Sequence, residues 1–117
     1  MERVTGIGGY FMRSRDPDAL MKWYTDNLGI PHFSTEIWQQ ESGPTVLAPF
    51  GEDTTYFGRM DKQTMINFRV RDLDAMLAQL RAAGADVEDE IETDEAGRFG
   101  HVTDPEGNRI QLWEPTT

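Results

Sequence analysis

The fold is decided by residues 13–20 (RSRDPDAL) and residues 69–76 (RVRDLDAM). The second segment repeats the pattern of the first, and its Asp72 corresponds to Asp16, 56 positions earlier. In each copy an alternating run ends at an aspartate and a helical pattern follows. An aspartate side chain accepts backbone amides of a first helical turn, so each aspartate is predicted to begin a helix. Gly29 and Gly84 follow the last apolar helical positions and are predicted to end the two helices. The matching starts and stops indicate two copies of one unit.

Each predicted helix lies between one extended segment and three more. Alternation and turn residues predict strands at 9–13, 32–38, 45–50 and 54–59 in the first half, and at 65–70, 86–91, 98–103 and 109–114 in the second. Each unit is therefore a βαβββ module. The sequence predicts an α+β protein, a single domain over 1–117 made of two modules at about 5–60 and 61–115, with two mixed sheets that are each backed by one helix.

The composition limits the classes of partner. The chain has 117 residues, no cysteine, and a formal charge of −10 from 21 acidic and 11 basic residues. Such a charge repels nucleic acid and anionic membrane surfaces. No apolar run approaches the roughly 20 residues that span a bilayer, and the first residues lack the layout of a signal peptide. These features predict a cytoplasmic protein that binds neither nucleic acid nor a membrane.

Strand alternation separates a helix-packing face from a second face. In 65–70, Ile66, Phe68 and Val70 form an apolar side that should meet a helix. The opposite side combines aromatics, arginines, amides and a histidine, which is typical of a ligand cup. The predicted ligand-binding residues of this cup are Phe11, Arg13, Met65, Asn67, Arg69, Phe99, His101, Gln111 and Trp113.

Two arginines occupy equivalent places in the two modules. Arg13 and Arg69 are predicted to point into the cup, where a guanidinium suits a carboxylate or phosphate. Together with His101 they favour an anionic group on a small ligand whose apolar body packs on the aromatics. The alternative is that the arginines pair with acidic neighbours at the rim.

Residues 104–115 (DPEGNRIQLWEP), together with 73–84, resemble the vicinal oxygen chelate superfamily of glyoxalase, bleomycin-resistance and dioxygenase-like proteins. The resemblance covers nearly the whole chain. It implies two modules that form a curved mixed sheet around one open cup, and a homodimer in which the halves are arranged either side by side or swapped. Its members include glyoxalase I, extradiol dioxygenases, methylmalonyl-CoA epimerase and drug-sequestering proteins, so the fold alone does not choose a function.

The enzymes of this superfamily use a divalent metal, which binds neighbouring oxygens of the substrate. The resemblance places ligands at Gly9, Met65 and Gln111, with a fourth position near Thr55 or Phe57. Glycine has no side-chain donor, a thioether is a weak ligand for a hard ion, and an amide oxygen is a poorer donor than a carboxylate. The sequence therefore predicts a degenerate metal site and no cofactor.

Three functions remain open. The favoured one is a bleomycin-resistance-like protein that binds a small hydrophobic or anionic molecule in its cup without metal. The alternative is a glyoxalase-like lyase or isomerase, or a dioxygenase-type enzyme, that uses a divalent metal or relies on His101 or the arginines. In the third, the dimer surface matters more than the cup. No catalytic residue is assigned, and the roles of His32 and Trp38 stay open.

Overall fold

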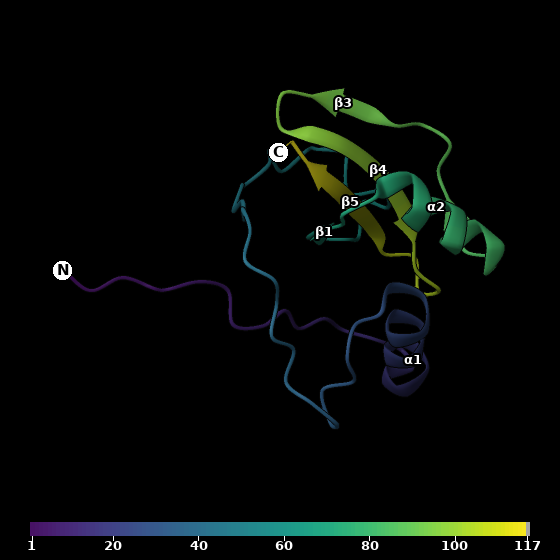
Figure 1. Ribbon diagram of the computed structural model, residues 1–117, viewed down its shortest axis with the longest axis horizontal. Coiled ribbons are helices and arrows are strands. Elements are labelled where there is room, and N and C mark those ends of the chain that lie inside the picture. Colours follow the sequence, from purple (N-terminus) through teal and green to yellow (C-terminus); the bar gives the residue numbers. More distant parts are fainter. Residues whose placement is uncertain (117) are drawn as a thin grey trace.

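The computed structural model describes residues 1–116. It is a mixed α+β structure with one open, uncurled sheet of five strands and two helices (Figure 1). The elements in chain order are α1 (Pro17–Leu28), β1 (Asn67–Arg69), α2 (Leu73–Ala82), β2 (Asp86–Val87), β3 (Glu92–Asp94), β4 (Gly97–Thr103) and β5 (Arg109–Pro115). In the described part of the chain, no helix is both long and apolar enough to cross a membrane.

Both helices begin at the aspartates that the sequence predicts. Asp16 accepts a hydrogen bond from the Ala19 amide at 3.2 Å, and Asp72 accepts one from the Ala75 amide at 3.0 Å. Helix α1 ends at Gly29, whose φ of 73° lies in the left-handed region that glycine enters without steric cost. The two helices, their N-caps and the stop at Gly29 are therefore confirmed, while α2 has Ala83 as its C-cap, one residue before the predicted Gly84.

The sheet brings three polar residues into one row. Its strand order is β1-β5-β4-β2, and β3 pairs with the other end of β4. Strand β1 runs parallel to β5 with Asn67 opposite Gln111, and β4 runs antiparallel to β5 with His101 opposite Gln111. Because directly opposed residues project to the same side of a sheet, these three side chains lie side by side across three strands.

The core lies between the helices and the other side of this sheet. Gly100 of β4 faces α2 so closely that a methyl group there would lie 3.1 Å from the Leu77 side chain. Each fully buried leucine contributes about 1.5–3 kcal/mol relative to an exposed one. The buried apolar residues are Leu20, Tyr24, Leu73, Leu77, Leu80, Val102, Ile110 and Leu112.

The first module differs from the prediction. Between residues 1 and 66 no strand is formed, so the strands predicted at 9–13, 32–38, 45–50 and 54–59 are wrong for this chain by itself. A strand is stable only where a neighbour takes up its backbone hydrogen bonds, and these segments have no such neighbour. The predicted second sheet and the curvature around a cup are absent for the same reason, because the edge of β1 away from β5 stays unpaired.

The second module agrees more closely with its prediction. The segments 65–70, 98–103 and 109–114 correspond to β1, β4 and β5. The segment 86–91 is shorter than predicted, because pairing with β4 covers only Asp86–Val87. An additional short strand, β3, occupies Glu92–Asp94, where the sequence predicts only the approach to a turn.

Large apolar side chains are exposed along the unpaired segments. Phe11 is 94% exposed and Leu47 is 92% exposed. The N-terminal segment runs away from the sheet and the helices (Figure 1). The other exposed large apolar residues are Met1, Val4, Ile7, Tyr10, Met12, Phe33, Ile37, Trp38, Val46, Phe50 and Met60.

Candidate ligand-binding face

The structure places seven of the nine predicted ligand-binding residues on one face of the sheet, opposite the helices. Since Gly100 and its neighbours of the same parity face α2, the alternate residues of β4 and β5 project the other way. We call this side the polar face. Its residues are Met65, just before β1, and Asn67, Arg69, Phe99, His101, Gln111 and Trp113.

The other two predicted residues do not join this face. Phe11 and Arg13 lie on the exposed N-terminal segment, which pairs with no strand. Arg69 donates to the backbone oxygen of Glu41 at 3.0 Å, and the side chain of Glu41 pairs with Arg71. A single chain therefore does not assemble the symmetric pair of arginines that the sequence predicts.

A chain of hydrogen bonds crosses the polar face. Asn67 Nδ2 donates to Gln111 Oε1 at 2.8 Å, and Gln111 Nε2 donates to the hydroxyl of Tyr56 at 3.0 Å. The Tyr56 hydroxyl in turn donates to Glu92 Oε2 at 2.6 Å. Both ends of the Gln111 amide are thus occupied, and the carboxylate of Glu92 terminates the chain.

His101 lies beneath this chain and is only 1% exposed. Its Nε2 is 3.4 Å from Gln111 Nε2, and its Nδ1 is 3.8 Å from a carboxylate oxygen of Glu92. Burial, followed by the positive charge of Arg109, lowers the pKa of His101, so the imidazole is neutral at pH 7. An amide N–H at Nε2 and a carboxylate near Nδ1 favour the tautomer with its proton on Nδ1.

Arg109 is held by a carboxylate and a backbone oxygen. Its Nε and Nη2 donate to the two oxygens of Glu88, each at 2.8 Å, and its Nη1 donates to the backbone oxygen of Tyr56. The hydrogen bonds from Arg109 lower the pKa of Glu88. The guanidinium carbon also lies 4.8 Å from the centre of the Tyr56 ring, within the range of a cation–π contact.

Aromatic rings cover the polar groups. The Tyr56 ring meets His101 edge-on at 5.5 Å, and Phe50 stacks on Tyr56 at 5.9 Å. Burial and the hydrogen bond to Glu92 raise the pKa of Tyr56 to about 12. Beside them Phe99 and Trp113 stack at 5.9 Å with an interplanar angle of 11°. The face thus combines a half-buried Phe99 ring, backed by the buried Trp113 ring, with directional polar groups.

Sequence reasoning missed Tyr56, Glu92, Glu88 and Arg109 as members of this site. The signal for Arg109 was present, because it shares its strand parity with Gln111 and Trp113. Tyr56 lies between the two positions, 55 and 57, that the family resemblance suggested. Glu88 carried the same kind of signal, because it continues the register of β2 with its amide donating to the His101 oxygen, whereas Glu92 lies opposite Phe99 in β3, a strand that the sequence did not predict.

The residues at the family's metal positions do not fit a tightly held divalent ion. Gly9 offers no side-chain donor, Met65 offers a thioether, and the amide oxygen of Gln111 already accepts from Asn67. Within residues 1–116, no three His, Cys, Asp or Glu side chains gather closely enough to hold a metal ion.

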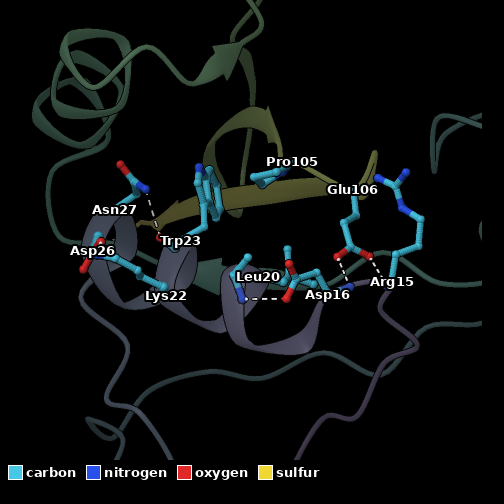
Figure 2. A pocket seen from close by; sticks show the side chains of 10 residues that line it. Arg15, Asp16, Leu20, Lys22, Trp23, Asp26, Asn27, Pro105 and Glu106 are labelled. Atoms are coloured by element: carbon cyan, nitrogen blue, oxygen red, sulfur yellow. Dashed lines mark hydrogen bonds and ion pairs between the residues drawn. The ribbon is translucent and has the colours of Figure 1, made fainter.

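Two surface hollows have none of the strand residues of the polar face in their lining, although Phe50 of the smaller one stacks on Tyr56. The larger, of about 420 Å³, runs along α1 and is lined by Lys22, Trp23, Pro105 and Glu106, among others (Figure 2). The charged groups here are engaged, since Lys22 pairs with Asp26. The smaller, of about 230 Å³, lies against residues 50–63. Neither hollow is lined by a predicted ligand-binding residue.

Glu106 attaches the start of α1 to the turn between β4 and β5. Its carboxylate accepts from the backbone amides of Arg15 and Asp16 at 2.7 and 3.1 Å (Figure 2). It also accepts from the Ser14 hydroxyl at 2.8 Å. These hydrogen bonds lower the pKa of Glu106. In this structure, Glu106 joins the two halves of the chain and does not contribute to the polar face.

The chain belongs to the glyoxalase-like domain family, which it matches over residues 10–113. Its fold resembles TnmS3, an antibiotic binding protein from Streptomyces sp. CB03234, with a TM-score of 0.65, 22% identity, and coverage of 99% of this chain and 100% of that one. It also resembles TioX from Micromonospora sp. ML1 (TM-score 0.54, 19% identity, 89% and 91% coverage) and glyoxalase I of Leishmania major (0.52, 18%, 88% and 81%). No curated protein matches the chain. The predicted family and its α+β fold class are confirmed.

Proposed function

We propose that the protein binds a small, uncharged, largely aromatic molecule on the polar face, without a metal ion and without altering it. The observation that carries this proposal is the stacked pair of Phe99 and Trp113 beside the hydrogen-bonded side chains of Asn67 and Gln111. Ligand sites combine such apolar surfaces with a few placed polar groups. The likeness to an antibiotic binding protein supports a binding role for this fold.

The same geometry disfavours the enzymatic alternative. A neutral histidine is the form that a general base requires, and His101 is held in that form. However, both ring nitrogens of His101 face protein groups, Gln111 Nε2 at 3.4 Å and a carboxylate oxygen of Glu92 at 3.8 Å, so neither nitrogen is directed at a bound molecule. The polar groups of the face hydrogen-bond to one another and thus serve recognition better than proton transfer.

A second copy of the chain is part of the proposal. The chain exposes 8842 Å², whereas a folded monomer of its mass, 13.3 kDa, exposes about 6,400 Å². The excess of roughly 2,400 Å² per chain is the size that large obligate dimers bury. Because the exposed apolar residues lie in the unpaired segments, we propose that these segments pack on a second copy to form a homodimer.

A panel of uncharged polycyclic aromatic compounds, titrated by calorimetry, tests the binding role. We expect Phe99→Ala to weaken the binding of every hit by about tenfold, because it removes half of the stacked pair. Met76→Ala is the matched control, since Met76 is a half-buried side chain of α2 that packs on the core, and it should leave affinity unchanged.

Two results would overturn this function. One is equal affinity of Phe99→Ala and the wild type for all hits, which would place binding elsewhere. The other is conversion of a bound compound, detected by mass spectrometry after incubation with the protein, which would make the protein an enzyme.

A further inference from the structure

The Tyr56 side chain lies on the polar face, with partners for both its ring and its hydroxyl. Its ring is contacted on one side by the guanidinium of Arg109 at 4.8 Å and by His101 edge-on at 5.5 Å. Its hydroxyl donates to Glu92 at 2.6 Å and accepts from Gln111 at 3.0 Å. The sheet and its connections therefore supply a partner for both functional parts of a phenol: the ring and the hydroxyl.

The segment that carries Tyr56 is not part of the sheet. Residues 50–60 form turns closed by local backbone hydrogen bonds, from Thr54 to Gly51 and from Gly58 to Thr55. The backbone oxygen of Tyr56 accepts a hydrogen bond from the Arg109 side chain of β5. A segment whose backbone has so few hydrogen bonds to the sheet opens at a lower free energy than the sheet does.

We propose that the natural ligand carries a phenol, and that this group takes the place of the Tyr56 side chain on the polar face. The inference rests on the proposed function and names its ligand class. A phenol reproduces the contacts of the Tyr56 side chain with Arg109 and His101 through its ring, and with Glu92 and Gln111 through its hydroxyl. An aromatic ether cannot donate to Glu92, an aliphatic alcohol has no ring for Arg109, and a carboxylate is repelled by Glu92.

Tyr56→Phe gives the sharpest test. The affinity for a phenol should rise if Tyr56 competes with the ligand, and should fall if the Tyr56 hydroxyl binds the ligand. If Tyr56 competes with the ligand, the variant loses the two hydrogen bonds of the competitor and leaves Glu92 and Gln111 free. It should then bind p-cresol about tenfold more tightly than the wild type. If the Tyr56 hydroxyl contacts the ligand instead, the same variant binds p-cresol more weakly, and the proposal is overturned.

Matched compounds and variants isolate the hydroxyl. 4-Methylanisole has the same ring without a donor, so in the Tyr56→Phe background it should bind about tenfold more weakly than p-cresol, and equal affinity of the two compounds would overturn the phenol class. Tyr10→Phe removes an exposed hydroxyl bonded to Thr64 and should not change binding. In the Tyr56→Phe background, Glu92→Gln should reverse the gain in p-cresol affinity, because the carboxylate acceptor is lost.

A spectroscopic measurement in the wild type follows the displacement directly. In the protein without ligand, the Tyr56 hydroxyl is held between Glu92 and Gln111, and a displaced side chain would be solvated. Saturating p-cresol at pH 7 should therefore move the nuclear magnetic resonance signal of one labelled tyrosine, a signal that Tyr56→Phe lacks, towards that of solvated tyrosine; no change would overturn the displacement.

The failure of this inference can be told apart from that of the proposed function. If uncharged aromatics bind in a Phe99-dependent way but p-cresol and 4-methylanisole bind alike, the binding role stands and the phenol class is wrong. If no aromatic compound binds to the wild type or to Tyr56→Phe, both proposals fall.

Discussion

Tyr24 and Asp104 are separated by 80 positions in the chain, and the Tyr24 hydroxyl donates to Asp104 Oδ2 at 2.7 Å in the core. Asp104 also accepts from the Asn108 side chain at 2.8 Å and from the backbone amides of Glu106 and Asn108. This buried carboxylate thus fixes the turn between β4 and β5 and binds α1 to it. It is the polar centre of the joint between the two halves of the chain.

Tyr24→Phe should lower the free energy of unfolding by about 1–2 kcal/mol, because the buried Asp104 loses one donor while its turn contacts remain. Chemical denaturation followed by circular dichroism measures this difference. Tyr10→Phe is the control, with an expected change near zero, since the Tyr10 hydroxyl is exposed. Equal stability of Tyr24→Phe and the wild type would show that the hydrogen bond does not hold the joint.

Alkaline pH should destabilise the fold through the same residue. Burial, followed by the hydrogen bond to Asp104, raises the pKa of Tyr24 well above its usual value of 10. The unfolded chain therefore loses this proton first, so the contribution of Tyr24 is complete below pH 10 and declines by about 1.4 kcal/mol for each pH unit above it. Melting temperatures between pH 9 and about pH 11 should fall less steeply for Tyr24→Phe.

Mild acid should destabilise the fold through His101. Its pKa in the folded state lies below the usual 6.5, so the unfolded chain takes up the proton first. The stabilising contribution is complete above pH 6.5 and is lost as the pH falls below 6.5 through the lowered pKa of folded His101. Melting temperatures over this range should be flatter for His101→Gln. A histidine nuclear magnetic resonance titration with a midpoint above 6.5 for His101 would contradict the burial argument.

Metal removal should change nothing. We expect elemental analysis of the purified protein to find no stoichiometric Ni, Zn, Mn or Fe, because Gly9, Met65 and Gln111 supply no imidazole or carboxylate. Addition of EDTA, or of each divalent ion, should leave the melting temperature unchanged. One equivalent of bound metal with a large rise in melting temperature would refute the metal-free proposal.

The protein should sediment at about twice its chain mass of 13.3 kDa, if a second copy covers the unpaired segments. Phe11→Glu should shift it towards the monomer, since Phe11 is 94% exposed in the single chain and a charge there opposes burial. Ala78→Glu adds the same charge at an exposed position of α2, outside the unpaired segments, and should keep the dimer. A monomer of the wild type at micromolar concentration would overturn the second-copy proposal.

Local signals in the sequence are enough to predict the helices and the second module. Asp16 and Asp72 cap helices through contacts three residues away, and the alternation in β4 and β5 separates His101 and Gln111 from Val102 and Ile110. Such patterns depend on neighbouring residues alone, so the sequence carries them. The same alternation explains why seven residues of the polar face could be named in advance.

The features that the sequence did not predict depend on long-range contacts. The segments 9–13 and 45–50 alternate like strands, yet a strand also needs an edge to pair with, and the sequence does not say which chain provides it. Tyr56 was missed because its place on the polar face depends on turns within residues 50–60 and on Glu92, which is 36 positions away. No spacing rule connects those two residues.

The pairing of Arg109 with Glu88 has a consequence for the chemistry that the protein tolerates. Glu88 cancels the charge of the guanidinium, and Glu92 adds a further negative charge nearby. Under the proposed binding role, an acidic compound would meet an unfavourable potential at the sheet, whereas a neutral compound would not. The Arg109–Glu88 ion pair would thus select for uncharged ligands.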